Sequence, residues 1–188
     1  MRVSPALAAP LVTGAVLLAT PLAAQESPGV MGDLFRSVSQ LEQKLTGLAN
    51  AIPAEKYSWR PAEGVRSVGE VFQHVAADNY LLPAFAGVAP PPATGIKADD
   101  YSTVQAYENR QASHADIVAD LQRSMAHLKQ ALRATPESRL NEEVSLFGTK
   151  ATVRGLWILT TTHLHEHLGQ MIAYARSIGV VPPWSRGG

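Results

Sequence analysis

Apolar residues recur every three or four positions along most of the chain, which is the period of helices that bury one face. The first such run begins after Ser27-Pro28 and ends before Pro53. Its apolar positions are Leu34, Val38, Leu41, Leu45 and Leu48. Proline suits the start of a helix, where its missing N–H needs no partner. No segment gives a convincing strand pattern, so the sequence predicts an all-α protein.

The second helix is predicted to begin at a capping box. In Ser67-Val68-Gly69-Glu70, the serine and the glutamate can each accept a hydrogen bond from the other's backbone N–H. The apolar stripe that follows comprises Val71, Phe72, Val75, Leu82 and Phe85. Residues 87–98, which include three consecutive prolines at 90–92, form a connection that is long for neighbouring antiparallel helices. It indicates a crossing over the end of a bundle.

The third helix is predicted to begin at a second capping-box sequence, Ser102-Thr103-Val104-Gln105, and to end near Ala134. The fourth begins near Thr152 and ends at Gly179, with Pro182-Pro183 beyond it as stop signals. Four long amphipathic helices in residues 25–188 predict a single-domain four-helix bundle with a long crossover between helices two and three.

The first 24 residues have the order of a secretory signal peptide. Arg2 is followed by a charge-free apolar run, and small residues precede a cleavage point after Ala24. The alternative is a membrane anchor, but prolines and a glycine leave the uninterrupted run short for a span of about 20 residues. We therefore expect a signal peptide at residues 1–24, no stable membrane span after cleavage, and a periplasmic or secreted protein.

The amino-acid composition limits which partners, nucleophiles and metal ligands are possible. The 16 basic and 16 acidic residues give a formal net charge of zero, so we expect no nucleic acid as a partner. The absence of cysteine rules out disulfides, thiolate metal sites and a thiol nucleophile. Any metal ion must therefore be held by histidine, carboxylate or backbone oxygen.

Three of the six histidines lie within five residues, at positions 163, 165 and 167. At about 100° per residue, His163 and His167 lie about 40° apart on one helix face, whereas His165 points about 200° away from His163. Two histidines at i and i+4 can reach one cation from a single helix. His165 is more consistent with the surface or an interface.

A third ligand would have to come from another helix. His74 lies at the edge of the apolar stripe of the second helix, and His114 lies within that of the third. A histidine on an apolar face is more often a hydrogen-bonded core residue, which is the competing interpretation of His114. His127 points away from the third helix's stripe, which predicts a solvated side chain.

Two carboxylates on the second helix are candidates for supporting roles. Glu70 is first a capping-box residue, but it also precedes His74 by one turn and could accept a hydrogen bond from the imidazole. Asp78 points into the apolar stripe, and a buried carboxylate needs a partner. That partner could be a ligand imidazole or an arginine.

Three segments together resemble the DinB-like family of damage-inducible-type metalloproteins. They are Tyr57-Ser58-Trp59-Arg60-Pro61, the segment from Ser67 to Val75, and the segment from His163 to Gln170 followed by Tyr174-Ala175-Arg176. The resemblance implies a four-helix bundle with a long crossover, a homodimer, and a divalent metal held by His74, His163 and His167. In some branches it implies a thiol-dependent transferase or isomerase, although the expected export argues against that role here.

The first functional hypothesis is a hydrolase-like, metal-dependent enzyme acting on an unknown small molecule. Zn, Ni, Fe and Mn are all candidate ions, since three imidazoles suit several divalent metals. The candidates for orienting water or accepting a proton are Glu70, Asp78, His114 and Gln170. One alternative is a non-catalytic periplasmic metal-binding protein. Another is a structural dimer, because the fourth helix carries a wide apolar arc that includes Trp157 and Leu164.

Overall fold

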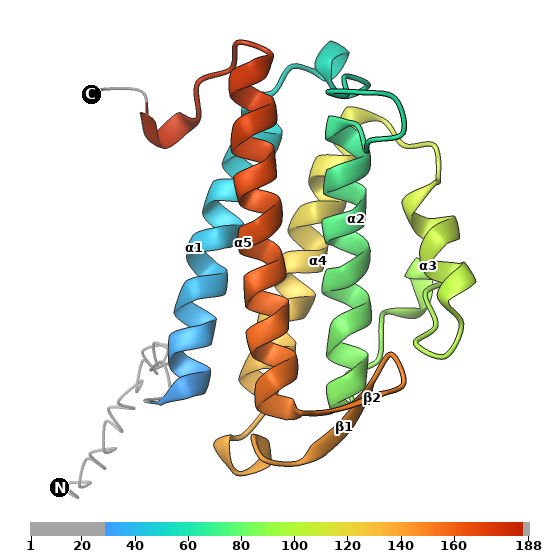
Figure 1. The fold of residues 1–188 in the computed structure, drawn as a ribbon, viewed down its shortest axis with the longest axis vertical. Helices are drawn as coiled ribbons and strands as arrows, with labels where there is room; N and C mark the ends of the chain where they lie inside the picture. Colours follow the sequence, from blue (N-terminus) through green and yellow to red (C-terminus); the bar gives the residue numbers. More distant parts are fainter. Residues whose placement is uncertain (1–28, 186–188) are drawn as a thin grey trace, which may run out of the picture.

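The computed structural model describes residues 29–185 and is mostly helical (Figure 1). Within these residues the long helices are α1 (Val30–Ala51), α2 (Val68–Leu81), α4 (His114–Ala134) and α5 (Val153–Ser177). In space α4 packs against α1 and α2, and α5 packs against the same two helices on the other side. All four contribute to one core, whose fully buried members include Leu45, Phe72, Leu128 and Trp157. The amphipathic pattern of the sequence thus becomes a four-helix bundle.

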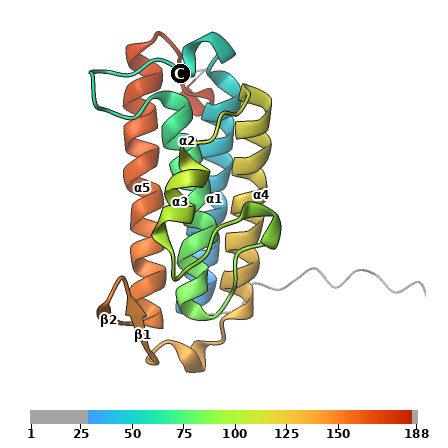
Figure 2. The ribbon, with the colours of Figure 1, turned by 90° about the vertical axis from the view of Figure 1, so that its right-hand side faces the viewer.

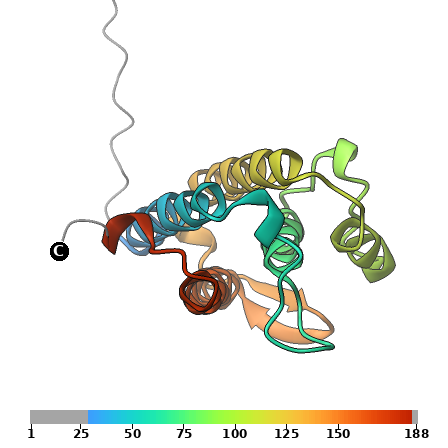
Figure 3. The same cartoon turned by 90° about the horizontal axis from the view of Figure 1, so that it is seen from above.

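The helices α2 and α4 run in the same direction, and α1 and α5 run opposite to them (Figure 1). The chain between α2 and α4 therefore returns from one end of the bundle to the other. This returning segment contains the 3₁₀ helices η2 (Leu82–Ala86) and η3 (Pro92–Thr94) and the short helix α3 (Tyr101–Glu108). Figures 2 and 3 show α3 outside the bundle, beside α2. A small second core, which includes Tyr80, Val104 and Tyr107, joins α3 to α2.

The capping box at the start of α2 is confirmed, because Ser67 and Glu70 exchange both hydrogen bonds. The prediction of one helix from residue 102 to residue 134 is wrong. The N-cap of α3 is Asp100, whose carboxylate accepts a hydrogen bond from the backbone N–H of Ser102. Residues 109–113 leave the helix, and a further capping box between Ser113 and Asp116 begins α4. The second helix also ends earlier than its stripe suggested, since Leu82 and Phe85 belong to η2.

The expectation of an all-α chain fails at one place. Strands β1 (Glu143–Leu146) and β2 (Thr149–Thr152) form an antiparallel hairpin before α5. Phe147 and Gly148 between them both have positive φ, at 50° and 79°, which suits the right-handed twist of a two-residue hairpin. Val144 and Leu146 pack against the core. Their alternation with polar residues is the pattern in the sequence that predicts a strand here.

The remaining 3₁₀ helices are η1 (Ala54–Lys56), η4 (Glu137–Arg139) and η5 (Pro183–Ser185). The predicted signal peptide and the Ser27-Pro28 helix start lie outside the described residues. Within residues 29–185, no helix combines the length and apolar character that a membrane span requires.

Candidate metal centre

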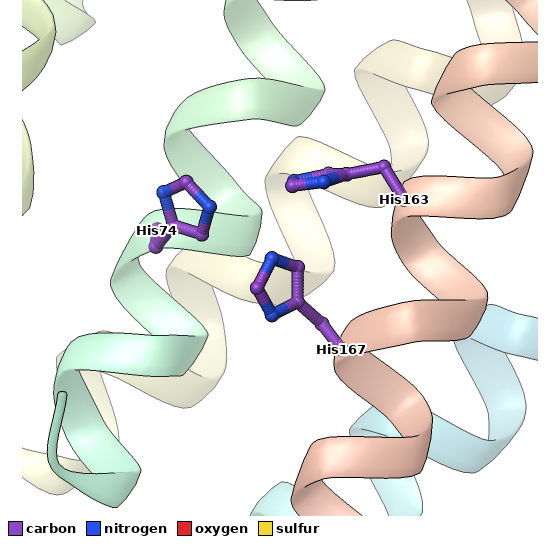
Figure 4. Close-up of side chains that lie close together, drawn as sticks. All are labelled: His74, His163 and His167. Carbon is purple, nitrogen blue, oxygen red and sulfur yellow. The ribbon is translucent and has the colours of Figure 1, made fainter. Parts of the chain in front are cut away.

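Three histidines from two neighbouring helices meet in the bundle. His74 comes from α2, and His163 and His167 lie one turn apart on α5, as Figure 4 shows. The ring centroid of His74 is 5.2 Å from that of His163 and 4.8 Å from that of His167. One nitrogen from each of the three side chains lies within 4.8 Å of the others. The structure therefore brings together the three histidines to which the family resemblance pointed.

Glu108 holds the ring of His74 from the far side. Its Oε1 lies 2.8 Å from His74 Nδ1, and its Oε2 accepts a hydrogen bond from Arg66 at 3.2 Å. Burial acts to raise the pKa of Glu108, but the hydrogen bond and charge of His74 and the charge of Arg66 outweigh it, so the pKa is lowered. Because an ionised carboxylate only accepts, His74 Nδ1 carries a proton, so the neutral form of this ring has its lone pair on Nε2. This is the arrangement that orients metal-binding histidines.

Gln170 orients the ring of His167 in the same way as Glu108 orients that of His74. His167 Nδ1 lies 2.8 Å from Gln170 Oε1, while Gln170 Nε2 donates to the Tyr174 hydroxyl at 3.1 Å. That hydroxyl in turn donates to the carbonyl oxygen of Arg66 at 3.3 Å. Burial lowers the pKa of His167 to about 4. The imidazole is therefore neutral near pH 7, with the lone pair of Nε2 available for a ligand.

Asp78 and His163 complete the cluster. Asp78 Oδ2 lies 2.8 Å from His163 Nε2 and 3.5 Å from His74 Nε2. The shorter distance lacks hydrogen-bond alignment, and within residues 29–185 the buried His163 Nε2 has no hydrogen-bond partner. A buried nitrogen without a partner is unfavourable unless another group, such as a metal ion, binds it. The donor set of three imidazoles, one of them with a buried nitrogen that makes no hydrogen bond, thus fits a divalent ion.

Two of the four residues predicted to orient water or accept a proton, Glu70 and His114, lie outside the three-histidine cluster. Glu70 does not accept from His74, because its carboxylate accepts from the backbone N–H of Ser67 at 2.7 Å and from Arg60 at 2.9 Å. Glu108, rather than Glu70, accepts the hydrogen bond from the His74 imidazole. His114 lies 3.4 Å from the carbonyl oxygen of Ala49 through Nε2, and its ring packs edge-on against another core side chain. His114 is therefore a hydrogen-bonded packing residue, which was the competing interpretation in the sequence analysis.

The other histidines have different surroundings. His165 is exposed, and its Nδ1 lies 2.9 Å from the carbonyl oxygen of Thr161, consistent with its predicted surface position. The prediction of a solvated His127 is wrong. Its ring is half-buried against Tyr80, 5.5 Å between centroids, and burial lowers its pKa. Tyr80 comes from α2, and Pro91 and Thr94 of the returning segment line a hollow together with His127, which helical angles alone could not show.

Sequence reasoning missed Glu108. The residue is the last of α3, and the sequence interpretation had placed it inside a long third helix. The signal that could have found it is the Ser113–Asp116 capping box, which separates α3 from α4. Once the two helices are separated, α3 is free to pack beside α2 and bring Glu108 to His74.

This fold and site define a class of protein: a four-helix bundle with a largely buried three-histidine cluster. The sequence profile of the DinB superfamily matches residues 38–171. The chain therefore belongs to the DinB superfamily.

Individual relatives agree with this assignment. The uncharacterized protein YjoA of Bacillus subtilis is 29% identical over 137 residues, which cover 70% of this chain and 80% of that protein. Among solved structures, a DinB-like protein from Bacillus cereus has a TM-score of 0.67 at 17% identity, covering 82% of this chain and 95% of its own. YfiT from B. subtilis has a TM-score of 0.61 at 14% identity, covering 84% and 94%. YfiT is described as a probable metal-dependent hydrolase with an unusual four-helix bundle topology.

Proposed function

We propose that this protein is a divalent-metal-dependent hydrolase in which His74, His163 and His167 bind the ion. The observation that carries the proposal is the way in which the three imidazole rings are oriented and hydrogen-bonded. Two of them donate Nδ1–H to an oxygen acceptor, and the third presents a buried Nε2 that makes no hydrogen bond among the described residues and lies 2.8 Å from Asp78 Oδ2. The description of YfiT as a probable metal-dependent hydrolase supports the reaction class.

A divalent ion at such a site supplies a Lewis acid and lowers the pKa of a bound water. The protein's own contribution is positioning. Glu108 fixes the tautomer and the ring plane of His74, and Gln170 does the same for His167. Tyr174 holds Gln170 in turn, so that two sets of hydrogen bonds keep the rings in place before any substrate arrives.

The substrate is proposed to be a small molecule, and two hollows lie beside Glu108, on the side of His74 away from the expected ion. A hollow of ≈ 200 Å³ is lined by Glu108 together with Arg60 and Arg66. Both arginine side chains are partly exposed, at 41% and 46%. A second hollow of ≈ 380 Å³ also reaches Glu108, and Gln73 lines it.

The experiment that tests the proposal is a hydrolysis screen of the metal-loaded chain with ester, amide and phosphate substrates. We expect turnover that requires the metal and that falls to background in His74→Ala. The matched control is His165→Ala, since His165 lies on the exposed side of α5 and should leave the rate unchanged. Tight metal binding without turnover of any substrate would instead favour the non-catalytic metal-binding alternative. Equal activity in wild type and a folded His74→Ala would contradict the assigned site.

Glu108→Gln should weaken metal binding by about 10–100-fold, as is typical when a group that orients a ligand is removed. The amide keeps the shape of the side chain but replaces the charged acceptor of His74 Nδ1–H. The measurement is competition for Zn²⁺ against a chromophoric chelator. Glu143→Gln is the control, because Glu143 pairs with Lys150 on the exposed hairpin. Unchanged affinity in Glu108→Gln would show that Glu108 does not support the metal site.

We also propose that the chain is exported after cleavage of residues 1–24, that residues 25–188 form a single domain, and that the mature protein is a homodimer. The composition of the leader and the wide apolar arc of the last helix support these proposals. We propose that the returning segment between α2 and α4 is the long crossover that the family resemblance implied. A thiol-dependent transferase remains the alternative if the protein stays in the cytosol.

A further inference from the structure

Asp78 lies on the side of His74 where the metal is expected. Asp78 follows His74 by one turn of α2, and its side chain is 13% exposed. Its Oδ2 faces Nε2 of both His74 and His163. Glu108 lies at the opposite edge of the His74 ring, on Nδ1. Two carboxylates therefore flank one imidazole, and the one on the Nε2 side is Asp78.

The distances fit atoms that share an ion. Two ligand atoms about 2.1 Å from a common metal are about 3.0 Å apart at a right angle and about 3.4 Å apart at the tetrahedral angle. Asp78 Oδ2 is 2.8 Å from His163 Nε2 and 3.5 Å from His74 Nε2, values close to these two. The 2.8 Å approach to His163 is not aligned as a hydrogen bond in this structure, so it is a close contact between a carboxylate oxygen and an imidazole nitrogen.

The charge of Asp78 also calls for a cation. A largely buried carboxylate is costly unless it is paired. Other poorly exposed carboxylates have an arginine: Glu108 pairs with Arg66, and Asp120 pairs with Arg110. For Asp78, the ion pairs within residues 29–185 include the two imidazoles and no lysine or arginine.

We propose that Asp78 binds the same divalent ion as the three histidines through Oδ2, giving a site with three nitrogen donors and one carboxylate oxygen. The inference rests on the proposed function only in requiring that the histidines bind an ion. The carboxylate lowers the net charge of the loaded site by one. It also adds an oxygen donor, which suits Mn²⁺ better than a site made of imidazole alone.

The test compares Zn²⁺ and Mn²⁺ binding by the full chain and by Asp78→Asn, using competition with a chromophoric chelator. We expect Asp78→Asn to weaken binding more than about 100-fold, beyond the 10–100-fold typical of groups that only orient ligands. The loss should be larger for Mn²⁺ than for Zn²⁺. Asp99→Asn is the control because Asp99 is exposed in the returning segment. Asp78→Ser is a second variant without the carboxylate, and circular dichroism checks that each variant folds.

A spectroscopic readout separates a ligand from an orienting group. The visible absorption of Co²⁺ depends on the number and type of its ligands, so Asp78→Asn should change the Co²⁺ spectrum. Glu108→Gln should leave that spectrum unchanged, because Glu108 acts through His74. Wild-type affinity and an unchanged spectrum in Asp78→Asn would overturn the role of Asp78 alone. Failure of the wild-type chain to bind any of the three ions would overturn the metal site and the proposed function together.

Discussion

Replacing His163 and His167 together with alanine should abolish divalent metal binding. The wild-type chain is expected to hold about one ion, whereas the double variant keeps only His74 and the proposed Asp78 donor, and two protein ligands cannot hold an ion tightly. Elemental mass spectrometry of both proteins after incubation with Zn²⁺, Ni²⁺, Mn²⁺ or Fe²⁺ and removal of free metal measures the difference directly. His165→Ala is the matched control from the same helix, since its side chain is exposed and points away from the cluster.

Metal binding should also appear as thermal stabilisation. An ion that binds the folded chain alone adds about 2.7 kcal/mol when its free concentration is about 100 times Kd. For a domain of this size that corresponds to a rise in Tm of about 5–10 °C. The rise should occur in wild type and His165→Ala and be absent in the double variant. If the double variant retains one tightly bound ion per chain, the ion lies elsewhere and the assignment of these histidines is wrong.

The sequence predicted one half of the candidate site more firmly than the other. His163 and His167 share a face because both lie on one helix, and the helical period alone determines that relation. The choice of His74 over His114 depends on how α2 and α4 rotate and pack, which spacing within a helix does not contain. Only the family resemblance favoured His74, and the structure places His74 beside the α5 pair.

Local capping signals explain both the successes and the errors in the fold. The Ser67 capping box predicted the start of α2 correctly, because its two hydrogen bonds involve neighbouring residues. The same type of signal at Ser113 went unused, so α3 and α4 were joined and Glu108 was misplaced. The contact between Glu108 and His74 joins residues 34 positions apart. It depends on the path of the returning segment, which no local pattern determines.

A substitution in the hydrophobic core should have a second large effect, on the stability of the fold and independent of metal binding. Trp157 on α5 is completely buried. Trp157→Ala should destabilise the protein by about 3–5 kcal/mol, because the small side chain leaves a cavity that the bundle cannot fill. Urea unfolding followed by circular dichroism measures the loss. Trp184→Ala is the control, since that ring is 43% exposed and its loss should cost less than about 0.5 kcal/mol.

Trp157→Phe separates the packing contribution from the polar one. Within residues 29–185, the buried indole N–H of Trp157 has no hydrogen-bond partner, and such a group costs about 1–3 kcal/mol. Phenylalanine removes that N–H and leaves a smaller cavity than alanine, so Trp157→Phe should lose much less stability than Trp157→Ala. Equal losses in the two variants would contradict a cost for the unpaired indole N–H. Because Trp157 precedes His163 on α5, metal binding by folded Trp157→Phe also tests whether the site tolerates changes in the core beneath it.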